Sequence, residues 1–586
     1  MCGVIGFLGP NAVPNTVDGL ESLEYRGYDS AGVSFQNGRE LRVIKSVGNV
    51  AKLRKKVLGQ YDSDVMTAIG HTRWATHGGV SEINTHPHIS YCGKISVVHN
   101  GIIENYKEVI TFLQTKDIEM KSQTDTEVIP HLISYYLDGN LLDAVKRAKT
   151  HLRGSYSFLV TCATFPNVMV AARHGRQPLT IGVGNDFYFV TSDIPSAKAK
   201  TDLLYALEDD EFAVIKKDWL VFYNDEREIK KKPLALDIET YKIDKEGYST
   251  FMEKEIFEIP NIIRRIITEY KNIVRTKQFK QVVKKVQDCD TVHIAACGTA
   301  YHAGLMIAQL LESKCRIRTR VYIASEVAFQ SPLFKENDVG MVISQSGETA
   351  DTMSALRIMK ESGLETIGIC NVAGSSISRQ VDYFLPIFAG TEVAVASTKA
   401  YIAQVVVGAI LVWTMQKEKS LFEDLSALAQ SIEIYLESAD SIQSIAKQQR
   451  KATKMFILGK GLDFVSALES ALKIKEITYK HCEGFAAGEL KHGTLSLVDK
   501  DTLTIVINTE PDNQAKKLKL DNASNEVMAR GSRVWIPDLS SVMSEPNSLS
   551  FILGVIPSQL FALYLAQSLK LCPDKPRNLA KAVTVE

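Results

Sequence analysis

The second residue of the chain is a cysteine, directly before the short apolar run GVIGF. If the initiator methionine is trimmed, Cys2 carries a thiol and a free α-amino group on one residue. An α-amine has a pKa of about 7.7 to 8.0, so it can act as general base for its own thiol without a separate histidine. Because most free cysteines in strands are buried packing groups, this interpretation needs support elsewhere in the chain.

Three further stretches carry groups that can bind a free amino acid at both ends. In HTRWATHGG, the Arg73 guanidinium can hold a carboxylate bidentately. In HNGIIEN, Asn100 and Gly101 offer donors for a tetrahedral oxyanion, and Asp125 in SQTDTEV can take an ammonium group. Each has a structural alternative: a surface ion pair for the arginine, a hairpin turn for Asn-Gly and a helix N-cap for the aspartate.

Hydroxyl-rich loops in the second half indicate a phosphate site. ISQSGETADT follows an apolar strand and opens a helix, so hydroxyls, a close backbone and helix amide donors meet there. The stretch is not a Walker loop, which favours a sugar phosphate over a nucleoside triphosphate. CGTAYHAG and VASTKAY are similar loops; an N-cap turn without a ligand is the alternative for each. The predicted sugar-phosphate-binding residues of these loops are Thr299, Ser344, Gln345, Ser346, Thr349 and Ser397.

A later helical stretch, SALESALKIKEITYK, carries charged residues on one face. Glu469, Lys473 and Glu476 stand at i, i+4 and i+7. A carboxylate beside a lysine can move a proton between adjacent carbons of an open-chain sugar, so we add Lys473 to the sugar site. The alternative is a solvated Glu–Lys pair. The Gly-punctuated run GFAAGELKHG follows and suits a site loop that includes His492.

The elements that must position these groups fall into two classes. To about residue 240, short apolar strands alternate with Gly- and Asn-rich turns, which predicts a β-rich sandwich with some helix. Beyond a charged connector, strand-length apolar runs alternate with helical periodicity, which indicates βαβ units on parallel sheets. KMFILGKGLDF repeats this pattern when Gly459 is aligned with Gly298, so we expect two tandem copies. The expected domains are 1–240, 241–425, 426–575 and an extended tail, 576–586.

Composition limits the function classes. A chain of 586 residues is too long for one core, and equal totals of 68 basic and 68 acidic residues do not ask for nucleic acid or an anionic membrane. Nine cysteines without a C-x-x-C pair favour a reducing cytosol and argue against zinc. The apolar run 402–413 is shorter than the roughly 20 residues of a spanning helix, and residues 1–15 lack a secretory signal. We therefore expect a cytoplasmic protein with small-molecule partners.

The first half resembles the glutaminase domain of the N-terminal-nucleophile (Ntn) amidotransferases. CGVIGF, EYRGYDSAG, HTRWATHG, HPH, HNGIIEN and QTDTE carry the resemblance. It implies an αββα sandwich in which Cys2 attacks the glutamine amide, forms a thioester and releases ammonia, with Asn100 and Gly101 as the oxyanion hole. It further implies a glutamine site, with the tryptophan near the ammonia exit, made of Arg73, Trp74, Thr76, His77 and Asp125.

The second half resembles the double sugar-isomerase (SIS) module of the isomerising glutamine–fructose-6-phosphate aminotransferases, so resemblance covers essentially the whole chain. That family implies two tandem α/β SIS domains with parallel sheets and conversion of fructose 6-phosphate and glutamine to glucosamine 6-phosphate and glutamate. By this match Lys581 forms a Schiff base with the ketose, Glu476 moves a proton from C1 to C2, His492 assists ring opening, and Lys473 is accessory. The resemblance also implies a homodimer in which His492 serves the neighbouring subunit, without metal or organic cofactor.

Three positions depart from the family pattern: Ala300, Ala394 and Thr494 stand where serine, glycine and proline are usual. Alternatives to the full reaction are a related amidotransferase acting on another ketose phosphate and a non-catalytic sugar-phosphate sensor. An amidotransferase feeding a phosphoribosyl or ATP-dependent partner would need loops that the sequence does not contain. Ammonia transfer between two sites must exclude water, because ammonium has no lone pair for attack, so we expect a closed apolar passage.

Overall fold

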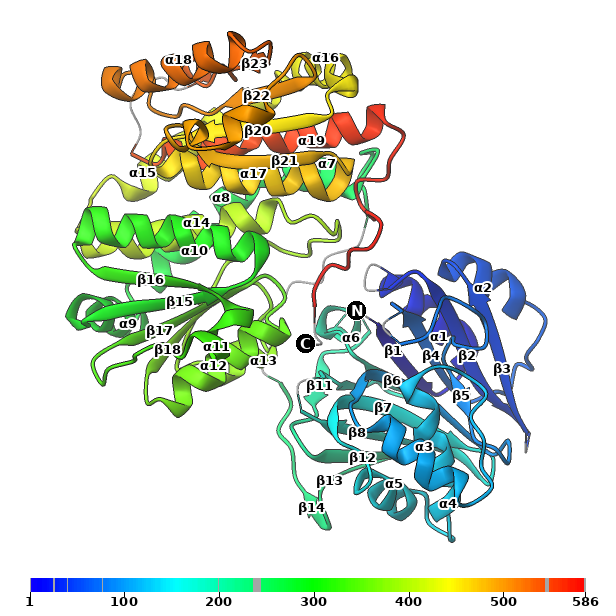
Figure 1. The fold of residues 1–586 in the computed structure, drawn as a ribbon. Helices are drawn as coiled ribbons and strands as arrows, with labels where there is room; N and C mark the ends of the chain where they lie inside the picture. The colour runs from blue at the N-terminus through cyan, green and yellow to red at the C-terminus, as the bar shows by residue number, and fades with distance from the viewer. Residues whose placement is uncertain are drawn as a thin grey trace.

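The computed structural model describes residues 2–24, 27–38, 40–75, 77–175, 177–198, 200–234, 244–542 and 548–583. Thr76, a predicted glutamine-site residue, lies outside these ranges. Figure 1 shows two bodies, an amino-terminal one and a carboxy-terminal one, with the end of the chain running from the second body toward the first.

The amino-terminal body is built on two stacked antiparallel sheets. The first has the order β11 (Leu203–Ala206), β9 (Thr180–Val183), β10 (Tyr188–Thr191), β1 (Gly3–Leu8), β4 (Thr67–Arg73), β2 (Ser30–Asn37), β3 (Glu40–Val47). The second has the order β14 (Arg227–Ile229), β13 (Trp219–Asn224), β12 (Glu211–Lys216), β8 (Phe165–His174), β7 (Gly154–Cys162), β6 (Ile95–Ile103), β5 (His88–Ile89).

Side-chain alternation along the strands sorts this body into four layers. Along β1, Val4 and Leu8 face the other sheet, where they pack with Leu159, while Ile5 and Phe7 face the outer helices. The helices on that face include α1 (Ala12–Ser22) and α2 (Val50–Val57), with α6 (Ile194–Lys198) beside them. The second sheet is covered by α3 (Tyr106–Gln114), α4 (Val128–Tyr136) and α5 (Leu141–Lys149), after the short helix η2 (Asp125–Glu127). The layering is αββα, which confirms the predicted sandwich.

The carboxy-terminal body contains two parallel sheets. One runs β16 (Arg318–Ile323), β15 (Thr291–Ala296), β17 (Val339–Ser344), β18 (Glu365–Cys370), β19 (Tyr383–Pro386). The other runs β21 (His481–Ala486), β20 (Lys454–Gly459), β22 (Thr502–Val506), β23 (Arg533–Trp535). The predicted α/β class of this half is therefore confirmed.

Helices cover both parallel sheets (Figure 1). Around the first sheet lie α8 (Ile259–Ile273), α9 (Lys277–Asp288), α10 (Gly298–Leu310), α11 (Val327–Gln330), α12 (Ala350–Glu361), α13 (Ser376–Gln380) and α14 (Lys399–Met415), with short turns η3 (Leu311–Cys315) and η4 (Ala324–Glu326). Around the second lie α15 (Leu421–Leu436), α16 (Ala439–Gln448), α17 (Leu462–Thr478), α18 (Gln514–Met528) and α19 (Ile556–Ser568), with turns η5 (Gln449–Lys451), η6 (Glu489–Lys491), η7 (Thr494–Leu497), η8 (Ser540–Val542) and η9 (Ser550–Val555). Helix α7 (Phe251–Phe257) precedes α8 and packs against α19 of the second group.

The most apolar segments lie inside this body. The run 402–413 forms part of α14, where every residue from Lys399 to Trp413 is buried, as predicted. Ser550–Ser568 is long and apolar enough to cross a membrane by length and composition, yet 94% of its apolar window is buried within the protein. A helix covered on all sides by its own chain is a core helix.

After α19 the chain leaves the second body as a tail of irregular structure, described to residue 583. The Tyr28 hydroxyl of the first body donates to the carbonyls of Pro576 (2.7 Å) and Leu579 (3.0 Å). Lys575 forms an ion pair with Glu24. The tail thus joins the two bodies (Figure 1).

Candidate active sites

Cys2 stands one residue before β1, at the edge of the sandwich. The backbone N–H of Trp74 donates to the Cys2 sulfur at 3.2 Å, and the Asn100 side-chain amide donates to the Cys2 carbonyl at 3.0 Å. Burial raises the pKa of the Cys2 thiol, while the positive charge at the chain terminus, the Trp74 amide and Arg73 act in the opposite direction. The thiol is therefore held in place, and its activation depends on nearby positive charge.

Asn100 and Gly101 lie inside β6, so the hairpin-turn alternative is wrong. His71 Nε2 lies 3.2 Å from the Asn100 side-chain oxygen, which directs the amide N–H₂ toward Cys2. Gly101 has φ +122°, and a Cβ there would stand 2.1 Å from the Ser155 carbonyl oxygen. Only glycine fits this backbone, so the two predicted oxyanion donors are brought to the cysteine by a strand whose geometry requires them.

Arg73 and Asp125 flank the same thiol, since each changes the pKa of Cys2. Arg73 is 3% exposed and donates to the carbonyls of His77 (2.6 Å) and Gly78 (3.0 Å), so the surface ion-pair alternative is wrong. The Asp125 carboxylate accepts from Ile103 N–H at 2.8 Å, next to the oxyanion strand, and Thr124 occupies the N-cap position. The site therefore contains a buried guanidinium and a buried carboxylate.

Buried histidines that the residue-by-residue prediction missed lie behind Asn100. His71 stacks on His86 at 4.1 Å, and His86 lies against His88 at 4.9 Å. Burial lowers the pKa of His71 to about 3 and that of His99 to about 4, so these imidazoles are neutral at physiological pH. HPH was the signal available in the sequence, but its spacing did not indicate a packed layer.

The predicted phosphate loop follows β17 and begins α12. Ser344 and Thr349 hydroxyls lie 3.0 Å apart, and the Gly347 amide donates to the Ser344 hydroxyl at 3.0 Å. Ser346 accepts from the Glu348 amide at 3.1 Å, and Gln345 is half-buried beside it. Hydroxyls and the α12 amides thus converge at one helix N-terminus, where an anion is favoured.

A charged cluster on α17 faces the start of α10. Lys473, which is fully buried, donates to the Thr299 hydroxyl at 2.9 Å and lies 2.6 Å from Glu476. Glu469 accepts from Thr299 at 3.1 Å and from His302 at 2.7 Å. The alternative of a solvated Glu–Lys pair is wrong for this helix. Lys473 is buried away from water, and a buried ammonium group must be paired with carboxylates and hydroxyls.

Lys581 reaches a third group of polar atoms. Its side chain is 3% exposed, and its ammonium donates to the Glu392 carboxylate and, at 2.7 Å, to the Ala394 carbonyl. Glu392 also accepts from the Ser397 hydroxyl at 2.8 Å and the Thr398 amide at 2.9 Å. The lysine of the irregular tail is thus fixed at one position in the second body.

The α17 cluster and the Lys581 cluster are close enough to interact electrostatically. Burial lowers the pKa of Lys473, but Glu469, Glu476 and Glu392 outweigh it and raise the value overall. Burial raises the pKa of Glu476, against the positive charges of Lys473 and Lys581. A carboxyl with a raised pKa beside two lysines suits proton exchange near neutral pH.

His492 is the predicted site residue that this chain does not bring to the others. It follows η6 and is exposed, outside the contacts that join Lys473, Glu476 and Lys581 among the described residues. Conversely, Glu392 and His302 belong to the site and were not predicted. An acidic residue at the start of the small, apolar run EVAVAS was a signal for Glu392; His302, in the first turns of α10, had none.

Comparisons with known proteins match both halves. The SIS domain family matches residues 285–413 and 449–536, and a glutamine amidotransferase domain family matches residues 71–199. The chain is 40% identical to the glutamine–fructose-6-phosphate aminotransferase (isomerising) of Clostridium tetani and 39% identical to that of Bacillus cereus strain ATCC 10987, over 100% of each chain.

Among solved structures, the C-terminal domain of the glucosamine–fructose-6-phosphate aminotransferase from Francisella tularensis superposes with a TM-score of 0.50 at 28% identity, covering 57% of this chain and 100% of that one. The chain belongs to the isomerising glutamine–fructose-6-phosphate aminotransferase family.

Proposed function

We propose that this protein converts fructose 6-phosphate and glutamine to glucosamine 6-phosphate and glutamate. The tail is the observation that carries the proposal. It places Lys581 against Glu392 in the second body while its upstream residues contact Tyr28, whose ring packs on Trp74 at 5.7 Å beside Cys2. One segment thus links a thiol site to a lysine site.

In the first reaction, loss of the initiator methionine frees the Cys2 amine, which takes the thiol proton as the sulfur attacks the glutamine amide. Burial raises the pKa of the Cys2 thiol, and the positive charges at the chain terminus and on Arg73 act against this rise. Asn100 and the Gly101 amide stabilise the tetrahedral oxyanion, and ammonia leaves as the thioester forms. Arg73 binds the substrate carboxylate, Asp125 its ammonium group, and Trp74, Thr76 and His77 complete the pocket; water then releases glutamate.

In the second reaction, the α12 loop binds the phosphate through Ser344, Gln345, Ser346 and Thr349, with Thr299 and Ser397 contributing from neighbouring loops. Lys581 attacks the C2 carbonyl of the open-chain ketose and expels water to form an imine. Ammonia displaces the lysine, and Glu476 moves a proton from C1 to C2, which yields the aldose amine. Lys473 keeps the Glu476 carboxylate in place.

We further propose that the active form is a cytoplasmic homodimer. The exposed position of His492 supports this, because a ring-opening histidine must lie within hydrogen-bond reach of a sugar, and a second copy can supply it. The domain boundaries at 240, 425 and 575 remain proposals. A non-catalytic sensor is disfavoured, since sugar sensing alone requires no thiol beside an oxyanion strand.

Product analysis with fructose 6-phosphate and amide-¹⁵N-glutamine tests the proposal. The label should appear in glucosamine 6-phosphate, and the mature protein should begin at Cys2 by intact mass. Excess unlabelled ammonium in the medium is the control, since a closed passage keeps the label from being diluted. Unlabelled product, or an active protein that retains its initiator methionine, would refute the scheme.

A further inference from the structure

Helix α7 begins the stretch FMEKEIFEIP, which follows the connector, and carries a carboxyl that neither proposed reaction uses. Glu255 is 2% exposed, and one of its oxygens accepts from the backbone amides of Val393 and, at 3.2 Å, Ala394. The glutamate therefore fastens the segment that follows Glu392 to α7. A carboxyl inside the protein is costly, so its retention there calls for a role.

The fastened segment is the one that holds Lys581. Glu392, immediately before it, receives the Lys581 ammonium, and the carbonyl of Ala394 receives a second N–H from the same ammonium at 2.7 Å. Ala394 therefore donates its N–H to Glu255 and accepts from the Lys581 ammonium through its C=O. These groups belong to the peptide units on either side of the Ala394 Cα, so a shift of Ala394 moves the lysine with it.

The beginning of α7 is fastened to the same tail. The Asp574 carboxylate accepts from the amides of Phe251 (2.9 Å) and Met252 (2.8 Å), and the Asp574 carbonyl accepts from the Val395 amide at 3.1 Å. The tail is thus held at Asp574, where it starts, and at Lys581, near its end. Helix α7 and the 392–395 segment together form a rigid frame between these two points.

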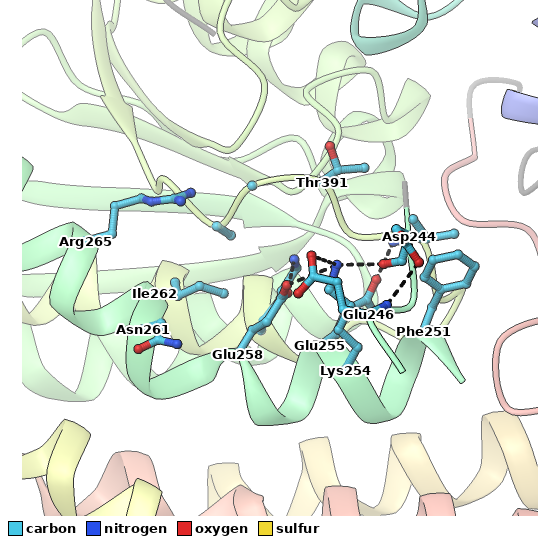
Figure 2. Close-up of a pocket in the computed structure, with 14 residues that line it drawn as sticks. Asp244, Glu246, Phe251, Lys254, Glu255, Glu258, Asn261, Ile262, Arg265 and Thr391 are labelled. Carbon is cyan, nitrogen blue, oxygen red and sulfur yellow. Dashed lines mark hydrogen bonds and ion pairs between the residues drawn. The ribbon is translucent and has the colours of Figure 1, made fainter. Parts of the chain in front are cut away.

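Figure 2 shows a cavity between α7 and the segment that carries Thr391; it is lined by Lys254 and Glu255 of α7 and by Glu258, which directly follows this helix. The cavity is about 380 Å³ in volume. Glu258 pairs with Lys399 at 2.7 Å and with Lys254 at 3.5 Å, so its charge is balanced without the 392–395 segment. Of Glu255 and Glu258, only Glu255 contacts backbone amides of the 392–395 segment among the described residues.

We propose that Glu255 is a positioning residue for Lys581, fixing the Val393–Ala394 peptide so that the lysine amine is aimed at the ketose carbonyl. The inference rests on the Schiff-base role proposed above for Lys581. It assigns to α7 a contribution to imine formation, whereas the main phosphate loop, residues 344–349, follows β17 and does not contact Glu255 in the described structure.

The protonation state of Glu255 makes the inference specific. Burial and the charge of Glu392 raise its pKa to about 8, against the positive charges of Lys581 and Lys399. At neutral pH the side chain is therefore a neutral carboxylic acid, and it acts on the two amides through a C=O oxygen. Glutamine offers the same oxygen at the same reach and should replace it; leucine fills the space without an acceptor.

The test separates imine formation from sugar-phosphate binding in Glu255→Gln, Glu255→Leu, Glu255→Asp and, as matched control, Glu258→Gln. Imine formation is measured by borohydride trapping with fructose 6-phosphate, located at Lys581 by peptide mass spectrometry. Binding is measured by calorimetry with glucitol 6-phosphate, which has no carbonyl. Since a misplacement of about 1 Å costs roughly 100-fold, we expect trapping to fall about 100-fold in Glu255→Leu and about 10-fold in Glu255→Asp.

Trapping in Glu255→Gln and Glu258→Gln should stay within about 3-fold of wild type, and glucitol 6-phosphate affinity within about 2-fold in all variants. Equal losses of trapping and binding would mean that Glu255 merely stabilises the fold, and normal trapping in Glu255→Leu or Glu255→Asp would overturn the proposal directly. Absence of a Lys581 adduct in the wild-type enzyme would instead overturn the proposed function, and the positioning role with it.

Discussion

Around Cys2 the buried titratable groups are mostly imidazoles, whereas around Lys581 they are carboxylates and lysines. His71, His86 and His99 are neutral because burial lowers each pKa. At the sugar site, Lys473 and Lys581 each lie against a glutamate, and the neighbouring carboxylates raise the pKa of Lys473.

The difference follows from what each reaction asks of its surroundings. A thiol attack on a neutral amide develops charge at one oxygen, which two oriented N–H donors can stabilise. Moving a proton along a phosphorylated ketose needs acids, bases and an amine close together, and each buried charge then needs a partner. The first site therefore depends mainly on the orientation of its N–H donors, and the second on the pairing of its buried charges.

Removal of the central group of each site gives the largest expected effects. Cys2→Ala should lower glutamine-dependent synthesis about 10⁴-fold and leave ammonia-dependent synthesis near wild type, as for loss of a nucleophile. Lys581→Arg should abolish synthesis from either nitrogen source while basal glutamine hydrolysis persists. Product chromatography with glutamine or ammonium chloride measures the two rates, and the same loss in both assays for Cys2→Ala would contradict separate sites.

The next largest effects are expected at two glycines with positive φ, one in each site. At Gly101 the obstacles to a Cβ are backbone atoms, the Ser155 carbonyl oxygen at 2.1 Å and the Tyr156 Cα at 2.7 Å, whereas at Gly347 they are the Ser375 hydroxyl at 2.0 Å and its Cβ at 2.5 Å. A loop serine can shift more readily than two paired strands, so Gly101→Ala should have the larger effect and lower glutaminase kcat about 100-fold. Gly347→Ala should chiefly raise the KM for fructose 6-phosphate, about 10-fold.

The double variant Gly347→Ala with Ser375→Gly checks this reasoning. It should recover part of the sugar-phosphate affinity, because both the hydroxyl and the Cβ that obstruct the added methyl group are removed. Equal kinetic losses for both single glycine variants would show that the side-chain and backbone obstacles are equivalent.

The pH dependence of stability should differ in sign between the bodies. His71 and His99 have folded pKa values of about 3 and about 4, below the unfolded 6.5, so the unfolded state binds more protons and stability falls as pH drops below 6.5. Glu255 has a folded pKa of about 8, above its unfolded 4.5, so its contribution is lost as pH rises from 4.5 to 8. Each group contributes at most about 1.4 kcal/mol per pH unit.

Buried thiols report each body separately: Cys162 ends β7 in the sandwich, and Cys370 ends β18 in the first parallel sheet. The urea midpoint for pulsed thiol labelling should fall at Cys162 on going from about pH 7 to about pH 5, and at Cys370 on going from about pH 6 to about pH 8.5. Glu255→Gln should flatten the second trend, because its amide does not titrate. If the urea midpoints at both cysteines changed in the same direction with pH, the predicted difference in sign between the two bodies would be wrong.

Sequence periodicity predicted the two fold classes because strand alternation and βαβ patterns are local. The residues of the thiol site were also predictable, since Arg73, Asn100 and Asp125 stand in short motifs. The sugar site was harder: Glu392 meets Lys581 across 189 positions and His302 meets Glu469 across 167. Such pairs depend on how the second body folds around its tail, and Glu255 depends further on α7 packing beside the 392–395 segment.

The smallest predicted effect concerns the contact between the sites. The Tyr28 hydroxyl is shared between the Pro576 and Leu579 carbonyls, and burial raises its pKa to about 12, so it remains a donor at physiological pH. Tyr28→Phe removes this hydrogen bond, worth about 1 kcal/mol, and keeps the ring contact with Trp74. Stimulation of glutaminase turnover by fructose 6-phosphate should therefore fall about 5-fold.

Lys575→Met is the matched comparison, because it breaks the other tail contact with the first body. The Lys575 side chain is 38% exposed, so its ion pair with Glu24 is screened and its loss should change the stimulation less than 2-fold, or about 0.4 kcal/mol. If the Tyr28 hydroxyl acts through the tail, Tyr28→Phe should change the stimulation of glutaminase turnover by fructose 6-phosphate and leave ammonia-dependent synthesis unchanged. Unchanged stimulation in Tyr28→Phe would mean that the two sites communicate through another part of the interface.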